Sequence, residues 1–373
     1  MKQLHLISFN YPYPPSYGGI IDVYYKIKVL SDLGIKIHLH CFVDQIPHKV
    51  DPEVEEITEN VFFYQKKKNP LLYFSGTPFA AAIRDSEALL KNLEENKAPI
   101  LFEGLQTTHI IQFLRDNDHK LYLRYHNNES EYYKGLSVSE KNIFKKIIYK
   151  IESLKYSGYQ KKLLKKFEAV FCLSEKEYNE VETYSGNAHL IHIFHGNTSV
   201  KELDTKGKYF LFHGDLTTAD NKRALHETIN LFKTLPQYQL VVASDRAAED
   251  IKRKISTIEN ISLTPIQTTE NLYNLLEDAH GNILISYQNS GTKVKLFNTL
   301  YNSRFVIING NITDDPVLKS VCLFGSDMNE IRQQIITSAE KEYHDTEKRK
   351  EILEKTHSDK AKANEMVKII FKN

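Results

Sequence analysis

The chain of 373 residues is longer than one ordinary hydrophobic core requires, so we expect two domains. Its composition, 41% hydrophobic and 26% charged, is that of a globular protein, and no apolar run approaches the length of a membrane span. A formal net charge of +1 excludes a general nucleic-acid binder, which would carry a large excess of basic residues.

Strand-like and helix-like patterns alternate along the first part of the chain. A helix is expected from Gly18 to Gly34, because apolar residues recur at helical spacing and glycine commonly ends a helix. Ser174 and Glu177 form a capping box, which predicts the start of another helix. Strands are expected at residues 4–9, 35–42, 99–102, 120–124, 169–173 and 189–194.

The polar segment 199–208 lacks apolar periodicity, and we place the domain boundary there, which gives domains 1–200 and 201–373. The alternation then restarts with strands expected at residues 209–212, 240–243, 283–285 and 305–308. A charged helical tail follows, and its last helix is expected to pack back on the first domain. Two successive βα arrays predict an α/β protein with two doubly wound, Rossmann-like domains that face a cleft.

The three cysteines lie far apart in apolar, strand-like runs: Cys41, Cys172 and Cys322. This spacing fits neither a disulfide framework nor a zinc site and indicates buried free thiols in a reducing compartment. Because the first residues are too few and too polar for a signal peptide, we expect a cytoplasmic protein.

The first strand is followed by a proline-rich loop, residues 10–19, that ends in Gly18 and Gly19. Glycines at a helix start let the backbone approach a phosphate or a sugar hydroxyl. Three tyrosines of this loop, Tyr11, Tyr13 and Tyr17, suggest a stacking surface for a sugar ring. The alternative is a stiff turn in which one glycine caps the helix.

A second polar segment, residues 124–129, follows a predicted strand and reads Arg-Tyr-His-Asn-Asn-Glu. Polar groups at the carboxyl end of such a strand face the crevice where α/β proteins bind ligands. The alternative is a helix capped by Asn128, with His126 a structural histidine that bonds to Glu129 or to the backbone.

The second domain repeats this arrangement. Gly214 follows a strand directly, and Ser290, Gly291 and Thr292 are expected at a helix start, with Lys293 and Lys295 in its first turns. Helix-terminal N–H groups, a hydroxyl and an ammonium together form a cradle for a diphosphate. Lysines are otherwise unfavourable at the positive end of a helix, although Lys293 alone fits a solvated face.

The order of these motifs resembles the retaining family 4 glycosyltransferases of GT-B fold. Gly18-Gly19 is similar to their glycine-rich acceptor-side loop, and residues 124–129 resemble their R-x-H-N-x-E strand end. Residues 171–174 resemble the strand and serine that follow the bridging helices. Residues 212–216 resemble the G-x-L segment that opens the nucleotide domain, and residues 291–296 resemble G-T-R/K-x-K-L.

The resemblance implies transfer of a sugar from a nucleotide-sugar donor to a glycan or lipid-linked acceptor, without metal or cofactor. His126 and Lys295 take the catalytic positions. Donor-binding residues are expected to be Gly214, Asn221, Arg223, Ser290, Gly291, Thr292, Lys293 and Asn298. Residues that contact the acceptor or the sugar are expected to be Tyr13, Tyr17, Gly18, Gly19, Arg124 and Asn127.

The sequence departs from the family pattern at several positions. Ser290 and Asn298 stand where the family has two glutamates, and Ser303 and Phe305 replace a glycine and a proline. The arginine that grips the diphosphate has its nearest candidates in Lys222 and Arg223. These departures favour an alternative, a catalytically weak or inactive protein of the same fold that acts as a scaffold. An inverting transferase or an epimerase is another alternative, with His126 or Asp22 as its base.

Residues 141–167 carry nine lysines against one glutamate, with Ile143, Ile147, Ile151 and Leu154 along one helical face. Two interpretations stay open. The segment is a basic amphipathic helix at the inner face of an anionic membrane, or a pair of core-packed helices with a solvated basic side.

Overall fold

The computed structural model describes residues 2–115, 118–140, 142–203, 205–288 and 293–372. The chain divides into two compact units, which we describe separately. Unit 1 comprises residues 1–196 and 362–373, and unit 2 comprises residues 197–361.

Unit 2 begins slightly earlier than the sequence placed the boundary. The Asn197 amide is bonded to two residues of helix α11 (Val294–Asn302): it donates to Asn298 and accepts from Asn302, at 2.9 Å each. Val200 N also donates to Glu354 at 2.9 Å. These bonds attach residues 197–200 to unit 2.

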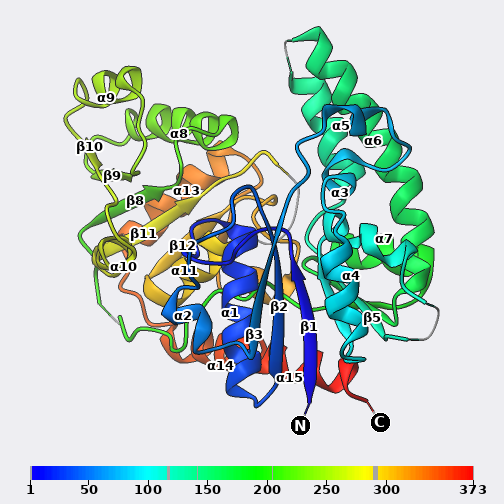
Figure 1. The fold of residues 1–373 in the computed structure, drawn as a ribbon. Helices are drawn as coiled ribbons and strands as arrows, with labels where there is room; N and C mark the ends of the chain where they lie inside the picture. The colour runs from blue at the N-terminus through cyan, green and yellow to red at the C-terminus, as the bar shows by residue number, and fades with distance from the viewer. Residues whose placement is uncertain (1, 116–117, 141, 204, 289–292, 373) are drawn as a thin grey trace. The chain divides into compact units, whose positions relative to one another are not determined.

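In the described residues, unit 1 holds a seven-stranded sheet of order β3-β2-β1-β4-β5-β6-β7, with neighbouring strands parallel (Figure 1). From β1 the chain adds β2 and β3 on one side of the sheet, and β4 to β7 then follow on the other side. The strand order thus reverses between β1 and β4, and α/β sheets bind ligands at the carboxyl ends of the strands beside such a switch point. The strands are β1 (Gln3–Ser8), β2 (Lys36–Val43), β3 (Asn60–Gln65), β4 (Ile100–Glu103), β5 (Leu121–Tyr125), β6 (Ala169–Cys172) and β7 (Ala188–Leu190).

Strand β7 is shorter than the predicted strand 189–194. The carbonyls of Ile191 and His192 accept hydrogen bonds from the Arg124 guanidinium, at 2.5 and 2.9 Å. The backbone N–H of Phe194 donates to Asp22 at 2.9 Å. Ile191 N still donates to the Cys172 carbonyl of β6 at 3.0 Å, and buried side chains hold the residues that follow it.

The helices of unit 1 cover both faces of its sheet. Ser174 starts α7 as predicted, since its hydroxyl accepts from Glu177 N at 3.4 Å and donates to the Glu177 carboxylate at 2.6 Å. The elements are α1 (Gly18–Asp32), α2 (Pro52–Glu55), η1 (Pro70–Phe74), α3 (Phe79–Ala82), α4 (Glu87–Glu94), η2 (Leu105–Gln112), α5 (Glu129–Ser139), α6 (Ile143–Leu163), η3 (Leu164–Lys166), α7 (Glu175–Ser185) and the end of α15 (Asp359–Ile370).

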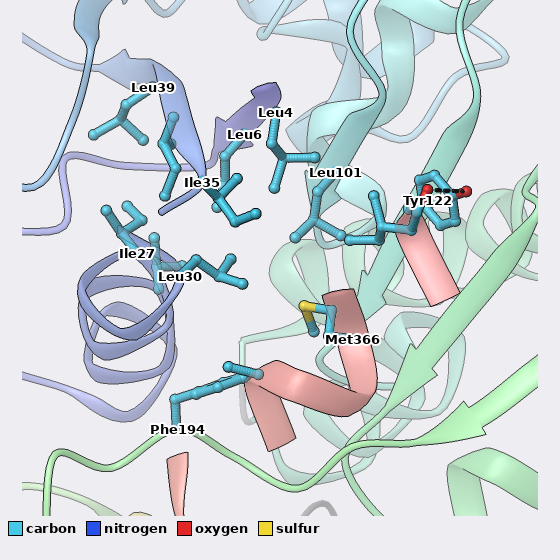
Figure 2. Packing of buried hydrophobic residues seen from close by; sticks show 14 of the residues in the cluster. Leu4, Leu6, Ile27, Leu30, Ile35, Leu39, Leu101, Tyr122, Phe194 and Met366 are labelled. Carbon is cyan, nitrogen blue, oxygen red and sulfur yellow. Dashed lines mark hydrogen bonds between the residues drawn. The ribbon is translucent and has the colours of Figure 1, made fainter. Parts of the chain in front are cut away.

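The core of unit 1 joins the first and last parts of the chain. Figure 2 shows Met366 of α15 among Leu30, Leu101 and Phe194, all of them buried. The Tyr122 hydroxyl donates to the Ile370 carbonyl at 3.1 Å. Each fully buried side chain of this size contributes roughly 1.5–3 kcal/mol, so the C-terminal segment is an integral part of this core.

Residues 143–163 of the basic segment form one helix, α6, rather than a pair of helices. Helix α6 is one long helix that lies along α5 (Figure 1). The Tyr133 and Tyr156 rings stack at 5.4 Å, and Ser130 and Ser153 exchange hydrogen bonds of 2.9 Å. These contacts fix which face of α6 is turned toward the protein.

The apolar stripe of α6 lies on the opposite side of the helix. Ile143, Ile147, Ile151 and Leu154 are 71, 52, 46 and 67% exposed. The core-packed interpretation is therefore wrong for this stripe, which faces outward.

In the described residues, unit 2 holds a six-stranded parallel sheet of order β10-β9-β8-β11-β12-β13. The strands are β8 (Tyr209–His213), β9 (Leu240–Ala243), β10 (Ile261–Thr264), β11 (Ala279–Leu284), β12 (Phe305–Ile308) and β13 (Leu323–Phe324). The helices are α8 (Ala219–Phe232), α9 (Glu249–Ile255), α10 (Thr269–Asp278), α11, α12 (Pro316–Lys319), α13 (Met328–Ala339) and α14 (Thr346–Thr356). Across the part of the chain that is described, each helix falls short of the length or the hydropathy that crossing a bilayer requires.

Candidate functional site

A cluster of buried charges lies beside the carboxyl ends of β4 and β5 in unit 1. The Lys26 ammonium is 2.8 Å from an Asp22 oxygen and 2.9 Å from a Glu103 oxygen. Arg124 binds both oxygens of Asp22, at 3.0 and 2.7 Å. All four side chains are fully buried, and their charges sum to zero, which is the condition under which buried ions are tolerated.

Asp22 is not available as a general base. Burial alone would raise its pKa, but the charges of Arg124 and Lys26 outweigh burial and hold the pKa of Asp22 below its usual range. Its oxygens are already bonded to Arg124, to Lys26 and to Phe194 N. The structure thus contradicts the interpretation of Asp22 as a base.

Arg124 supports the fold of this site. Its side chain has no exposed surface, and its guanidinium connects Asp22 to the carbonyls of Ile191 and His192. In this structure Arg124 therefore offers no surface to a sugar, contrary to the expected contact.

His126 follows β5 and lies next to this cluster. Its Nε2 is 2.9 Å from Glu103 Oε2, so its partner is Glu103 and not Glu129 or the backbone. The Phe9 ring packs edge-on against the imidazole, with centroids 5.7 Å apart. The His126 side chain remains 13% exposed, whereas Glu103 is fully buried. Of the groups in this cluster, His126 is thus the one that reaches the surface.

The residues after His126 begin helix α5. The Asn128 side chain accepts from Glu131 N at 3.0 Å and is the N-cap. Asn127 is half-buried between the cap and His126. Burial raises the pKa of Glu129 to about 7, an effect that Arg84 opposes.

The proline-rich loop does not present three tyrosines as one stacking surface. The Tyr11 hydroxyl accepts from Asp51 N at 2.9 Å, and the Tyr13 hydroxyl donates to Glu53 at 2.7 Å. Tyr17, the N-cap of α1, is 50% exposed and is the member of the three open to a ligand.

Gly18 and Gly19 start α1, and Gly19 has a packing role. A Cβ at Gly19 would lie 3.0 Å from the tip of the Phe9 ring, which in turn packs on His126. A larger residue there would displace the ring that supports His126.

A second group of predicted residues gathers at the carboxyl edge of the sheet in unit 2. His213 ends β8, and its Nε2 is 3.2 Å from Thr299 Oγ1 of α11. Burial, and then the charge of Lys295, lower the pKa of His213 to about 3. The Asn221 amide donates to the Asp215 carbonyl at 2.9 Å, and a Cβ at Gly214 would lie 3.1 Å from that amide. Asn221 and Gly214 therefore shape the turn between β8 and α8.

Asp220 and Tyr287, which the sequence did not single out, connect α8 to the segment after β11. Asp220 accepts from Tyr287 N at 2.7 Å and from the Ser286 hydroxyl at 2.8 Å. The Arg223 guanidinium lies over the Tyr287 ring at 3.7 Å. Arg223 is therefore held beside the segment that leads to residues 289–292. An acidic residue in the first turn of α8 was the available signal, but it is also common in helices without such a role.

Lys295 lies in the first turn of α11, and Lys293 is the N-cap of this helix. Burial, and then the charge of Lys293, lower the pKa of Lys295 to about 8, an effect that Asp220 opposes. Ser290, Gly291 and Thr292 lie outside the described residues. Among the described residues the helix begins at Val294, so Lys293 precedes the first turn in which the sequence had placed it.

Asn298 lies one turn after Lys295. Its amide oxygen accepts from Asn197 at 2.9 Å, which orients its amide nitrogen away from that bond. The Nδ2 group of Asn298 can therefore donate to another partner, while Oδ1 keeps one further lone pair.

Among the described residues of unit 1, three side chains of the buried cluster have the composition of a metal site. Ligand atoms of Asp22, Glu103 and His126 lie within 4.8 Å of one another. The Lys26 ammonium contacts both carboxylates and supplies the positive charge that a metal ion would bring. These residues therefore do not fit a metal ion.

Comparison with known structures identifies the fold. S. aureus TarM, solved as a mutant with fondaparinux, alpha-GlcNAc-glycerol and UDP, is 10% identical and aligns over 100% of both chains with a TM-score of 0.66. Sucrose-phosphate synthase from Thermosynechococcus elongatus is 14% identical, with 98% of this chain and 97% of that chain covered and a TM-score of 0.65. Anabaena HepE with UDP-glucose is 10% identical, with coverage of 98 and 95% and a TM-score of 0.59.

The chain has the GT-B fold of glycosyltransferases, as the sequence predicted. No protein-family model matches the sequence. A curated relative, described as an uncharacterized 44.6 kDa protein in cps region of Klebsiella pneumoniae, is 25% identical over 325 residues, with 82% of each chain covered.

Proposed function

We propose that the chain is a glycosyltransferase that moves a sugar from a nucleotide-sugar donor to a glycan acceptor with retention of anomeric configuration. The observation that carries this proposal is Lys295, a half-buried ammonium in the first turn of α11. The helix terminus is itself positive, and Lys293 lowers the pKa of Lys295 further. This position favours a bound anion, and a diphosphate supplies one.

The proposed reaction needs charge stabilisation more than acid–base groups. The bond between the anomeric carbon and the phosphate oxygen breaks, and the acceptor hydroxyl oxygen bonds to that carbon on the same face. The departing phosphate takes the hydroxyl proton. Lys295 and Arg223 stabilise the leaving diphosphate, and His126 positions the sugar.

The ligands present in two of the similar structures support a nucleotide-sugar donor. TarM was solved with UDP and HepE with UDP-glucose, so UDP-sugars are the first donors to test. Asn298, oriented as a donor by Asn197, would then offer its N–H groups to a ribose hydroxyl.

Two alternatives have less support. An inverting enzyme needs a general base, and of its two candidates Asp22 is fully buried and ion-paired, which leaves His126 alone for that role. A non-catalytic scaffold would explain Ser290 and Asn298 in place of glutamates, but it gives no reason for a cationic helix start. A thermal-shift panel of nucleoside diphosphates distinguishes a transferase from a scaffold. A bound nucleotide raises the Tm of a transferase by mass action, whereas the Tm of a scaffold should not change.

The acceptor is proposed to be lipid-linked, with α6 lying on an anionic membrane surface. Leu71 and Phe74 of η1 are 69 and 86% exposed, and Lys155 of α6 donates to the Tyr73 carbonyl at 2.7 Å, which ties η1 to the exposed apolar stripe. Lysines flank this stripe along α6. Apolar side chains enter the headgroup boundary while lysines contact anionic headgroups.

Donor hydrolysis across UDP- and GDP-sugars tests the catalytic proposal. The wild-type chain should release free sugar from one donor, and His126→Ala and Lys295→Ala should each abolish release while leaving folding intact. Lys233→Ala, an exposed lysine at the far end of α8, is the matched control. Wild-type rates in both site variants would refute the assignment.

Vesicle sedimentation tests the membrane proposal. Wild-type protein should sediment with anionic vesicles but not with neutral ones, and added salt should weaken the binding. Ile147→Ser/Ile151→Ser should lower the bound fraction, and Val317→Ser, exposed in unit 2, should not. Equal sedimentation of all three proteins would contradict it.

A further inference from the structure

We propose that Glu103 is a positioning residue that fixes the tautomer of His126, so that the imidazole accepts a hydrogen bond from the substrate through Nδ1. The inference rests on the proposed function for the identity of that substrate hydroxyl. The geometry that carries it lies entirely within unit 1.

The contact between the two side chains determines which nitrogen carries the proton. His126 Nε2 is 2.9 Å from Glu103 Oε2, and an ionised carboxylate only accepts hydrogen bonds. The proton must therefore be on Nε2. A neutral imidazole has a single N–H group, so Nδ1 carries a lone pair and acts as an acceptor.

A buried ammonium faces both oxygens of the Glu103 carboxylate. Lys26 Nζ is 2.9 Å from Glu103 Oε1 and 3.0 Å from Oε2, and both side chains are fully buried. The remaining charge of Asp22 is matched by Arg124. The two carboxylates and two cations already balance without His126, so the cluster is neutral when His126 is a neutral imidazole.

The backbone places these groups with little freedom. Glu103 and Arg124 are register partners on the adjacent strands β4 and β5, and Lys26 is one turn after Asp22 on α1. Phe9 packs edge-on against the ring at an interplanar angle of 89°. Ring rotation, tautomer and charge of His126 are thus each set by a different neighbour.

The tautomer of His126 is measurable without substrate. Long-range ¹H–¹⁵N NMR of the full chain at about pH 8 should show a protonated Nε2 and an unprotonated Nδ1 in His126. A protonated Nδ1 would overturn the proposal. This measurement requires no activity, so failure to hydrolyse any nucleotide sugar would count against the proposed function alone.

Glu103→Gln removes the fixed acceptor, because an amide can donate as readily as it accepts. The tautomer should become mixed, and kcat for donor hydrolysis should fall on the order of tenfold to a hundredfold with a smaller change in KM. Glu129→Gln, which removes another carboxylate close to His126 in the sequence, should leave the tautomer of His126 unchanged. Retention of both tautomer and kcat in Glu103→Gln would refute the role.

If Glu103→Gln does not fold, a second variant tests the same role. The double variant Lys26→Met/Glu103→Gln removes one charge of each sign and keeps the buried cluster neutral. It should show the same mixed tautomer, and an unchanged Nε2–H form there would also refute the role of Glu103.

Discussion

The two groups of predicted site residues differ in how their charges are balanced. In unit 1, Asp22, Lys26, Glu103 and Arg124 neutralise one another in full burial. In unit 2, Lys295 lies at a positive helix end. Burial and the charge of Lys293 lower its pKa, and the Asp220 carboxylate, which raises the pKa, has a smaller effect than either.

The buried charges of unit 1 therefore stabilise the fold, whereas Lys295 of unit 2 is placed to bind an anionic ligand. The unit 1 cluster is complete and presents a single oriented group, His126. At the unit 2 edge, Lys295 lies at the positive end of a helix, a position that favours a bound anion. We expect changes in the first region to affect stability and changes in the second to affect binding.

The largest expected effect on stability is that of Arg124→Met. The variant leaves Asp22 with one cation in place of two, and breaking a buried ion pair costs about 3–5 kcal/mol. Urea denaturation should show this loss, with Arg223→Met of unit 2 as the control that changes stability little because Arg223 is exposed. Equal losses of stability in the two variants would contradict the proposed difference between the charges of unit 1 and unit 2.

The next effect concerns the pH dependence of nucleotide binding. Lys295 has a pKa of about 8, so the charged form that binds an anion is lost as pH rises through that value. Affinity for the nucleoside diphosphate should fall about tenfold between pH 7 and pH 9. Titration calorimetry measures it, and Lys295→Arg, which stays charged, should show a flat profile.

A buried histidine pair in unit 1 provides an acid-sensitive comparison. His5 Nδ1 lies 2.9 Å from His40 Nε2, and the Tyr64 hydroxyl lies 2.8 Å from His40 Nδ1. Burial lowers the pKa of His5 to about 4 and that of His40 well below its usual value. These rings are therefore neutral in the folded chain at pH values where the unfolded chain binds protons.

The sign of the pH effect follows from that difference. Between about pH 6.5 and pH 4 the unfolded state takes up more protons, so unfolding free energy falls as pH falls, by up to about 1.4 kcal/mol per pH unit for each histidine. Denaturant unfolding at several pH values should show the slope. His40→Gln should reduce it, whereas His48→Gln, an exposed histidine, should not.

The smallest expected change is a gain in stability. Lys295→Met removes a half-buried charge that the ligand-free chain does not need, so stability should be unchanged or rise by about 0.5–1 kcal/mol. Lys26→Met is the contrasting variant and should be destabilising, because it leaves two carboxylates with one cation. A thermal melt of each purified variant decides it, and a clear loss in Lys295→Met would contradict the expected role.

Much of the fold was predictable because buried parallel strands are continuous apolar runs. The runs at 240–243 and 305–308 became β9 and β12. The missed strands β3, β10 and β13 lie at or near sheet edges and expose part of their side chains, which weakens the apolar signal.

The site was only partly predictable. His126 and Lys295 were found because they follow strands or begin a helix. Lys26 and Glu103 were missed, since a lysine in a helix is usually solvated. The signal was the position of Lys26 on the buried face of α1, between Val23 and Leu30, four residues after an aspartate. A partner from a strand distant in sequence cannot be read from local pattern.

Titration calorimetry of nucleoside diphosphates into the wild-type chain and Lys295→Ala tests the central claim most directly, with UDP, GDP, ADP and CDP as ligands. The account predicts that at least one binds the wild type and that the variant binds it about 10- to 100-fold more weakly, as loss of a charged hydrogen bond implies. Binding of equal strength in the variant, or of none of the four to the wild type, would contradict it.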